Sequence, residues 1–237
     1  MGLAHSPRVV TDGLVLALDA GNAKSYSGSG TTWTDISRNG NNGTLTNGPT
    51  YSNGSIVFDG TNDNVLITNP TTIKNQNFTI SVWVNPGTQN ASIVSIIDFD
   101  HASSPLQGWV LQSEDATTNR YFYLAWRGES SFQPSGGGGF GAGKGIQVTN
   151  STWQNIVYSK NGTSLLGYLN GTQLYSGTSA SSTVSYENNK NLMIGSCVAF
   201  SSRSFKGDIS NTTIYNRALT ASEIQQNFNA LRGRFGI

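Results

Sequence analysis

The residues whose types and spacing come closest to a reaction or metal centre are Asp98, Asp100 and His101. Alternation along a strand would place the two carboxylates on one face, about 7 Å apart, and turn His101 to the other face unless the strand ends first. That separation suits the acid and base of an inverting glycosidase, which leave room for a water molecule. Acid and base normally flank the substrate, however, so structural or loop-end carboxylates are the favoured interpretation.

A second candidate is the aromatic segment at residues 120–127. One alternating set is expected in the core, namely Phe122, Leu124 and Trp126. The other set, Tyr121, Tyr123 and Arg127, is then expected to face outward. Exposed aromatic rings beside polar groups stack on sugar rings or anchor protein interfaces, although plain packing on the sheet surface is the alternative. The residues predicted to bind a ligand or partner are therefore Tyr121, Tyr123, Arg127, Asp98, Asp100 and His101.

Three further carboxylates, Asp59, Asp63 and Asp208, could supply oxygen ligands to a cation such as Ca²⁺. Aspartates also bond nearby turn amides, and that capping role is the favoured reading here. The sequence therefore predicts no metal and no cofactor, with these three residues as the positions to test for one.

The elements that must position these residues are short strands joined by tight turns. In residues 54–67, GSIVFDGTNDNVLI, two alternating apolar runs flank the turn pair Asp59-Gly60. The chain also has 28 glycines and six Asn-Gly pairs, which tolerate the positive φ of hairpin turns. Strands are expected at residues 14–19, 54–67 (two), 78–84, 92–99, 108–112, 120–127, 145–148, 153–159, 164–170, 191–195 and 209–215.

Two segments break this pattern. Residues 20–51 are polar and glycine-rich and are expected to form a long connection anchored by Trp33, Ile36 and Leu45. Residues 221–231 are expected to form a short amphipathic helix covering a sheet edge or end, because Thr220 and Glu223 have capping-box spacing.

At 237 residues the chain is long enough for one substantial core. We expect residues 1–12 to form an N-terminal arm and residues 13–237 a single domain. Residues 1–12 and 233–237 lack a periodic pattern, so neighbouring subunits are expected to hold both ends.

Composition excludes several classes of protein. The net charge is +1 without a run of Lys or Arg, so a nucleic-acid partner is not expected. No apolar stretch approaches the roughly 20 residues that span a bilayer, and residues 1–12 lack the core of a secretory signal. We therefore expect no membrane insertion and a cytosol-like environment. The single Cys197 excludes an internal disulfide.

Three ordered segments resemble a known family. They are Phe58, Asp59, Gly60 and Asp63 in FDG-x-x-D; NFTISVWVNP at residues 77–86; and FKGDISNTTIYNRALTASEI at residues 205–224. The chain resembles laminin-G-like, concanavalin A-type domains, which implies an all-β antiparallel β-sandwich, a jelly roll, with a short C-terminal helix. The resemblance does not decide function, because this sandwich hosts lectins, adhesins, glycosidases and structural modules.

The departures from the family's patterns concern catalysis and calcium. Retaining glucanases of this fold carry a Glu-x-Asp-x-(x)-Glu strand, whereas this chain has only four widely separated glutamates. Where relatives place calcium-binding acids, it has Ser196 and Cys197, and then Ser210 and Asn211. Neither enzymatic activity nor dependence on calcium is expected.

A finer resemblance suggests a setting. The segments GLVLALDAGNAKSY, TTWTDIS, NGNNGTLTNG and IYNRALTASEI resemble domains of tailed-bacteriophage virion proteins. That implies a non-enzymatic head or tail surface component, assembled in the host cytoplasm, with other virion proteins or copies of itself as partners. The alternative is a carbohydrate-binding lectin or adhesin, either standalone or as a virion module that engages host-surface glycans. A glucanase-type glycoside hydrolase is the third hypothesis.

Overall fold

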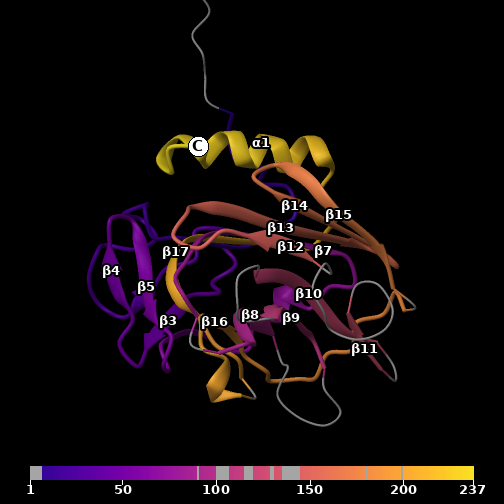
Figure 1. Ribbon diagram of the computed structural model, residues 1–237, viewed down its shortest axis with the longest axis horizontal. Helices are drawn as coiled ribbons and strands as arrows, with labels where there is room; N and C mark the ends of the chain where they lie inside the picture. The colour runs from indigo at the N-terminus through magenta and orange to yellow at the C-terminus, as the bar shows by residue number, and fades with distance from the viewer. Residues whose placement is uncertain are drawn as a thin grey trace, which may run out of the picture.

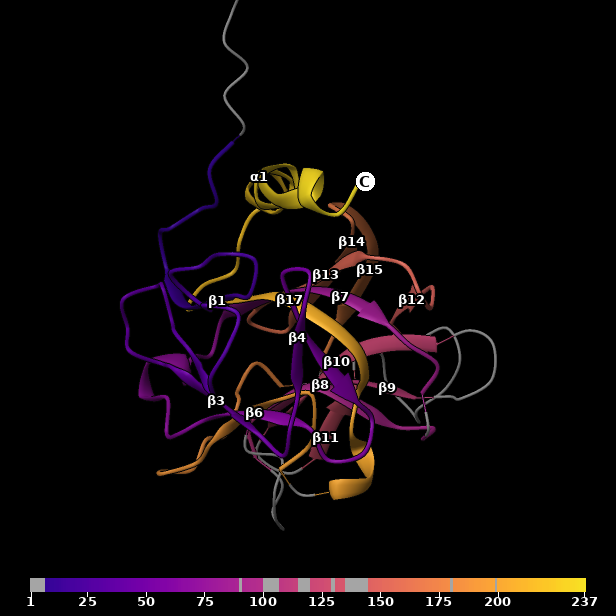
Figure 2. The same ribbon diagram turned by 90° about the vertical axis from the view of Figure 1, so that its left-hand side faces the viewer.

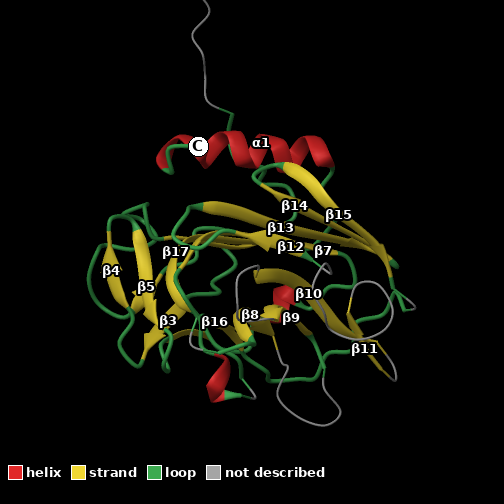
Figure 3. Cartoon of the chain, in the orientation of Figure 1, coloured by secondary structure: helices red, strands yellow, loops and turns green. Residues whose placement is uncertain are grey.

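The computed structural model describes residues 7–89, 91–99, 107–114, 120–128, 131–134, 145–179, 181–198 and 200–237. Within these residues, two antiparallel sheets of eight and nine strands, sheet A and sheet B, face one another. One α-helix lies over the outer face of sheet A (Figures 1 and 3). This all-β sandwich with a short C-terminal helix confirms the predicted fold class.

Sheet A contains β1 (Leu14–Asp19), β4 (Thr50–Ser52), β5 (Ser55–Asp59), β7 (Phe78–Pro86), β13 (Gln154–Asn161), β14 (Ser164–Leu169), β15 (Thr172–Thr178) and β17 (Lys206–Tyr215). Sheet B contains β2 (Thr32–Trp33), β3 (Gly43–Thr46), β6 (Asn64–Ile67), β8 (Val94–Phe99), β9 (Trp109–Glu114), β10 (Arg120–Gly128), β11 (Ser131–Pro134), β12 (Ile146–Val148) and β16 (Leu192–Ile194). The helices are α1 (Ala221–Leu231) and the single 3₁₀ turns η1 (Thr71–Ile73), η2 (Ser201–Arg203) and η3 (Arg232–Arg234).

Strand β17 organises sheet A, whose order is β15-β14-β13-β7-β17-β5-β4. One edge of β17 pairs with β7, and the other edge is divided between β5 and β1. Residues 206–209 pair with β5, residues 211–215 pair with β1, and the register shifts between them. Ser210 therefore lies at a bulge, where a strand can redirect a side chain.

The core lies between the sheets and follows the predicted alternation. On β7 the buried inward set is Phe78, Ile80, Val82 and Val84, and on β10 it is Phe122, Leu124 and Trp126. Both sets match the faces predicted from a period of two. Because the inward faces are continuous, the sandwich has one main hydrophobic core.

Asn-Gly pairs close two hairpins of sheet A, as predicted. Asn53 and Gly54 (φ 48° and 80°) join β4 to β5, and Asn170 and Gly171 (φ 52° and 78°) join β14 to β15. Two consecutive positive φ values define the turn whose twist matches that of paired strands. The first of these turns also shapes the pocket described below.

The expectation of a long connection over residues 20–51 is wrong in part. That segment contains β2, β3 and β4, and Trp33 is fully buried in the main core. Leu45 is also buried, whereas Ile36 is 36% exposed. These short strands lie in a segment rich in Gly, Asn, Ser and Thr without an apolar run, so the sequence pattern did not reveal them.

Helix α1 has the predicted bounds. The Thr220 hydroxyl accepts a hydrogen bond from the Glu223 amide, and the Glu223 carboxylate accepts one from the Thr220 amide. Ile224 and Phe228 are buried toward sheet A, so the helix covers the face of the sheet and not its edge (Figure 3). Among the described residues, no helix is long and apolar enough to cross a membrane.

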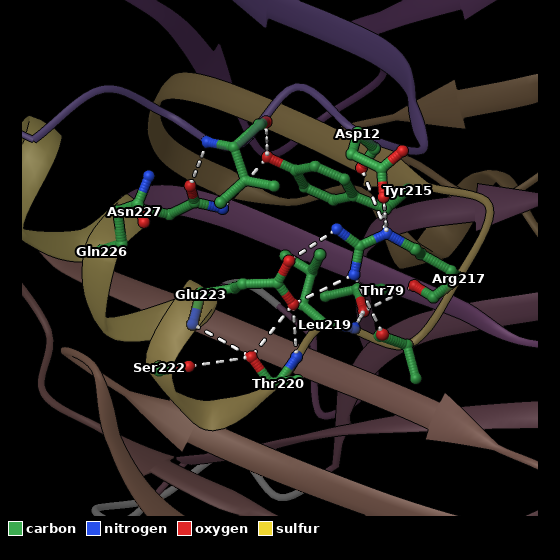
Figure 4. Close-up of polar contacts among 12 residues, drawn as sticks. Asp12, Thr79, Tyr215, Arg217, Leu219, Thr220, Ser222, Glu223, Gln226 and Asn227 are labelled. Atoms are coloured by element: carbon green, nitrogen blue, oxygen red, sulfur yellow. Dashed lines mark hydrogen bonds and ion pairs between the residues drawn. The ribbon is translucent and has the colours of Figure 1, made fainter.

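The described N-terminal residues dock on their own chain although they lack a periodic pattern, and the expectation that neighbouring subunits also hold the ends stays a prediction. Val10 accepts a hydrogen bond from the Tyr215 hydroxyl (2.9 Å) and donates one to Asn227 Oδ1 (2.7 Å). Arg217 forms ion pairs with Asp12 and Glu223, as Figure 4 shows. The N-terminal segment therefore packs on β17 and α1 of its own chain; residues 1–6 lie outside the described residues.

Candidate functional site

On the outer face of sheet B, the structure places two of the predicted ligand-binding residues below the surface. Asp98 is fully buried, and Tyr123 is only 4% exposed. Tyr123 packs with Val110 and Ala125, and its hydroxyl accepts a hydrogen bond from Gln112 Nε2 at 2.6 Å. The prediction that Tyr123 is an exposed platform is therefore wrong: alternation correctly directed it away from the main core but did not reveal that it is covered.

The remaining predicted residues of sheet B are dispersed. Tyr121 is half-buried, and its hydroxyl lies 3.5 Å from Gln147 Oε1 on β12. The backbone of Arg127 pairs with Phe132, and its side chain lies outside the described part of the structure. Asp100 and His101 are also outside the described residues. The described structure therefore does not assemble these six residues into one site.

Two of the three candidate metal ligands cap the turn between β5 and β6. Asp63 Oδ2 accepts the Asp59 amide at 2.9 Å, and Asp59 Oδ1 accepts the Thr61 amide at 2.7 Å. Asp208 instead accepts a hydrogen bond from Asn85 Nδ2. Burial raises the pKa of Asp63 and of Asp208. Nowhere in the described ranges do three His, Cys, Asp or Glu side chains gather as metal ligands.

A pocket of about 460 Å³ lies instead beside the C-terminal end of α1, on the side of the β4–β5 hairpin. Figures 1 and 2 show the hairpin and the C-terminus on this same side. The described residues that line it are Gly21, Tyr51, Asn53, Gly54, Trp153, Ser210, Arg234 and Phe235. Its volume falls within the range of small-molecule sites.

The hairpin forms one wall. Tyr51 on the edge strand β4 is 39% exposed, and its ring lies 5.3 Å from that of Tyr26. Tyr26 is fixed by its hydroxyl, which donates to Gly30 O at 2.7 Å. From the bulge of β17, the Ser210 hydroxyl donates to Gly54 O at 2.7 Å. The turn and its tyrosine are therefore attached firmly to the sheet.

Aromatic rings form the opposite wall. Phe235 stacks on Trp83 of β7, with ring centroids 4.1 Å apart and an interplanar angle of 12°. Trp153, directly before β13, lies 4.8 Å from Phe235 at a tilt of 47°. Trp83 is buried, whereas Phe235 and Trp153 remain half-buried at the pocket. The C-terminal segment thus covers one tryptophan and presents a ring beside another.

An ion pair defines the polar side. Arg234 Nη1 and Nη2 donate to the two carboxylate oxygens of Asp19 at 2.9 and 2.8 Å. Asp19 is 8% exposed and also accepts the Gly21 amide at 3.1 Å. A Cβ on Gly21 would lie 1.7 Å from Arg234 Nη2, so glycine is required for the guanidinium to reach Asp19.

The pocket therefore combines half-exposed rings with a few fixed polar groups. Stacked rings favour flat apolar ligand faces, while Asn53 and Arg234 offer hydrogen bonds at the margin. The sequence pattern did not predict this pocket, whose lining residues come from strands β4 and β17, from loops and from the C-terminal segment. The available signals were Tyr51 beside an Asn-Gly turn and an isolated Trp153 before a strand.

Two facing antiparallel sheets and an aromatic pocket define the class as a lectin-like β-sandwich. The chain belongs to the concanavalin A-like lectin/glucanases superfamily, whose model matches residues 59–225. No curated protein sequence gives a significant match.

Solved structures share the fold at low identity. A sialidase of Trypanosoma rangeli in complex with sialic acid matches with a TM-score of 0.66 and 14% identity, over 98% of this chain and 36% of the sialidase. Domain 4 of AbnA, a GH43 extracellular arabinanase from Geobacillus stearothermophilus in complex with arabinotriose, matches at 0.62 and 17%, over 90% and 97%. The binding domain of botulinum neurotoxin serotype D matches at 0.63 and 13%, over 92% and 52%. The chain thus spans about a third of the sialidase.

Proposed function

We propose that this protein is a non-catalytic carbohydrate-binding domain that holds a saccharide in the pocket between the β4–β5 hairpin and the C-terminal segment. The observation that carries the proposal is the placement of Tyr51, Trp153 and Phe235 around one pocket of about 460 Å³. Aromatic rings pack against the C–H faces of a sugar ring, and polar groups beside them fix its hydroxyls. The AbnA domain, a structural neighbour over nearly its full length, is in complex with arabinotriose.

The proposed absence of catalysis is supported by the carboxylates. Glycoside hydrolysis normally requires two carboxyl groups flanking the scissile bond. Arg234 occupies both carboxylate oxygens of Asp19 beside the pocket, and Asp98 is fully buried on the other sheet. No Asp or Glu is among the described residues that line the pocket. The structural neighbours include enzymes as well as binding domains. For the present chain we propose binding without catalysis.

The proposal is tested by titrating saccharides into the purified protein in a calorimeter. A panel of neutral and acidic trisaccharides should contain at least one ligand. Trp153→Ala should weaken its binding at least about 10-fold, in line with the loss of a stacked aromatic contact. A reducing-sugar assay on the same ligands should show no release of product.

The matched control is Leu174→Ala on β15. Leu174 is 57% exposed and does not line the pocket, so this variant should bind as the wild type does. The variant Tyr121→Ala tests the alternative that saccharides bind on the outer face of sheet B. Loss of binding in Tyr121→Ala with full binding in Trp153→Ala would move the site to sheet B and refute the proposed pocket.

The setting of this activity is a further part of the proposal. The resemblance to tailed-bacteriophage virion proteins supports a surface module of a head or tail, whose pocket would engage host glycans. Mass spectrometry of purified virions, with an antibody against this chain, tests that setting directly. Absence of the chain from intact particles would leave a standalone lectin as the proposed function.

A further inference from the structure

The charges around the pocket carry an inference about ligand class, which rests on the proposed function. Among the described lining residues, Arg234 is the one charged side chain. Its partner Asp19 lies directly behind it, and the two form a bidentate pair. The Asp19 side chain is 11% exposed and that of Arg234 is 34% exposed. The pocket therefore offers hydrogen-bond donors without a net charge.

We propose that the pocket selects neutral saccharides and discriminates against acidic ones, with the Asp19–Arg234 pair as the determinant of that specificity. A uronate or sialate carboxylate reaching Arg234 would meet a guanidinium that is already neutralised. It would also place a second negative charge near the mostly buried Asp19, and like charges at such distances repel. A sugar hydroxyl bears no such cost and accepts an N–H of Arg234 or of the Asn53 amide.

The pair is held in place by the surrounding chain. Gly21 leaves room for the guanidinium and donates its amide to Asp19 Oδ1. The Ser25 hydroxyl accepts the Asp19 amide at 3.0 Å and donates to Thr34 O at 2.6 Å, which fixes the end of β1. The carboxylate is thereby anchored independently of any ligand. The carboxylate of an acidic sugar would have to compete for Arg234 with Asp19, which is already oriented toward it.

The test compares ligands that differ in charge alone. Trigalacturonic acid and its neutral methyl ester are titrated into the full chain, beside arabinotriose, cellotriose and 3′-sialyllactose. At low ionic strength, neutral members should bind at least about 10-fold more tightly than acidic members of the same length. Asp19→Asn unpairs the Arg234 charge and should shift the acid-to-ester preference toward the acid by about 5- to 10-fold.

Two outcomes separate this inference from the proposed function. If acidic ligands bind as tightly as neutral ones, or more tightly, and Trp153→Ala removes that binding, neutral selectivity is refuted while the carbohydrate site stands. If no saccharide binds, or binding is unaffected by Trp153→Ala, both fail. Should Asp19→Asn melt below the assay temperature, Arg234→Gln replaces it. That variant removes the guanidinium charge and leaves Asp19 unpaired, so it should raise the preference for the ester over the acid; an unchanged or reversed preference would overturn the inference.

Discussion

The outer faces of the two sheets bear similar aromatic residues but bury them differently. On sheet A, Trp83 lies beneath α1 and the C-terminal segment and stacks on Phe228 and Phe235. On sheet B, Tyr123 is buried beside Val110 and hydrogen-bonded through its hydroxyl. The cover over sheet A, which consists of α1 and the C-terminal segment at residues 232–237, ends at the pocket. Phe235 is half-buried there.

The difference shows that a strand residue's direction and its accessibility are separate properties. Trp83 and Tyr123 both point away from the main core, and both are buried. The rings that remain available at the pocket belong to the hairpin, the segment before β13 and the chain end. Binding surfaces on this sandwich are therefore built by what is added to the sheet, as expected when loops carry function on a rigid scaffold.

The largest expected effect tests whether the cover of sheet A is part of the folded core. Trp83→Ala removes a side chain that is 1% exposed and stacked against two rings. We expect the free energy of unfolding to fall by about 3–5 kcal/mol, as for other buried aromatic truncations. Chemical denaturation measures it, with Leu174→Ala as the exposed control expected to change by less than about 0.5 kcal/mol. A small loss in Trp83→Ala would mean that α1 is only loosely attached.

The next effect sharpens the role of the Asp19–Arg234 pair. Gly21→Ala would place a methyl group 1.7 Å from Arg234 Nη2, so the guanidinium must leave Asp19. We expect a loss of about 1 kcal/mol, since the mostly buried carboxylate then loses its charged partner and keeps the Gly21 amide. Gly233→Ala is the matched control, because nothing lies within 4 Å of its added Cβ. Thermal melts that do not distinguish the two variants would show that the pair contributes little.

Much of the fold could be predicted from local pattern. Strand β1 spans the predicted residues 14–19, and α1 spans the predicted 221–231. Strand β1 begins with five consecutive apolar residues, LVLAL, and α1 repeats apolar residues at helical intervals. The turn at Asn53–Gly54 was also predicted, because its residue types specify positive φ. Strands β2, β3 and β4 were not, since their polar, glycine-rich segment contains no run of apolar residues.

The candidate site could not be predicted in the same way. Its residues Gly21, Tyr51, Trp153 and Arg234 are far apart in the sequence, and none of them belongs to a long periodic run. Their proximity depends on β17 joining β1, β5 and β7 in one sheet. Long-range pairing of this kind leaves no local signal, so the prediction settled on the aromatic strand β10 instead.

A smaller effect concerns how the cover over sheet A is attached. Hydrogen bonds from Arg217 and from the Thr220 amide lower the pKa of Glu223 to about 2. A lowered carboxyl pKa stabilises the fold above the unfolded pKa of about 4.3, and this is lost as the pH falls toward 2. Because the Glu223 side chain is 25% exposed, solvent screening reduces the contribution to about 1 kcal/mol.

The variant that measures this contribution is Glu223→Gln, whose side-chain oxygen can still accept the Thr220 amide in the capping box. Its deficit in unfolding free energy relative to wild type should be present at pH 7 and shrink between pH 5 and pH 3. Glu187→Gln breaks a more exposed ion pair with Lys190 and should cost less than about 0.5 kcal/mol. A deficit in Glu223→Gln that stays constant with pH would contradict the ionic attachment of α1.

The smallest effect is expected on sheet B and would break the comparison if it proved large. Tyr121 is half-buried, and its hydroxyl is 3.5 Å from Gln147 Oε1, a long contact at the limit of hydrogen bonding. Tyr121→Ala should therefore cost about 0.5–1 kcal/mol of stability, and saccharide affinity should stay within about 2-fold of wild type.

Calorimetric titration of each ligand found for the wild type measures this, with Tyr51→Ala as the matched tyrosine truncation at the pocket. Tyr51 is 39% exposed on the edge strand β4, so its loss should likewise cost little stability while weakening saccharide binding. If affinity instead fell in Tyr121→Ala and held in Tyr51→Ala, the outer face of sheet B would be the binding face. The C-terminal segment would then serve only to cover Trp83.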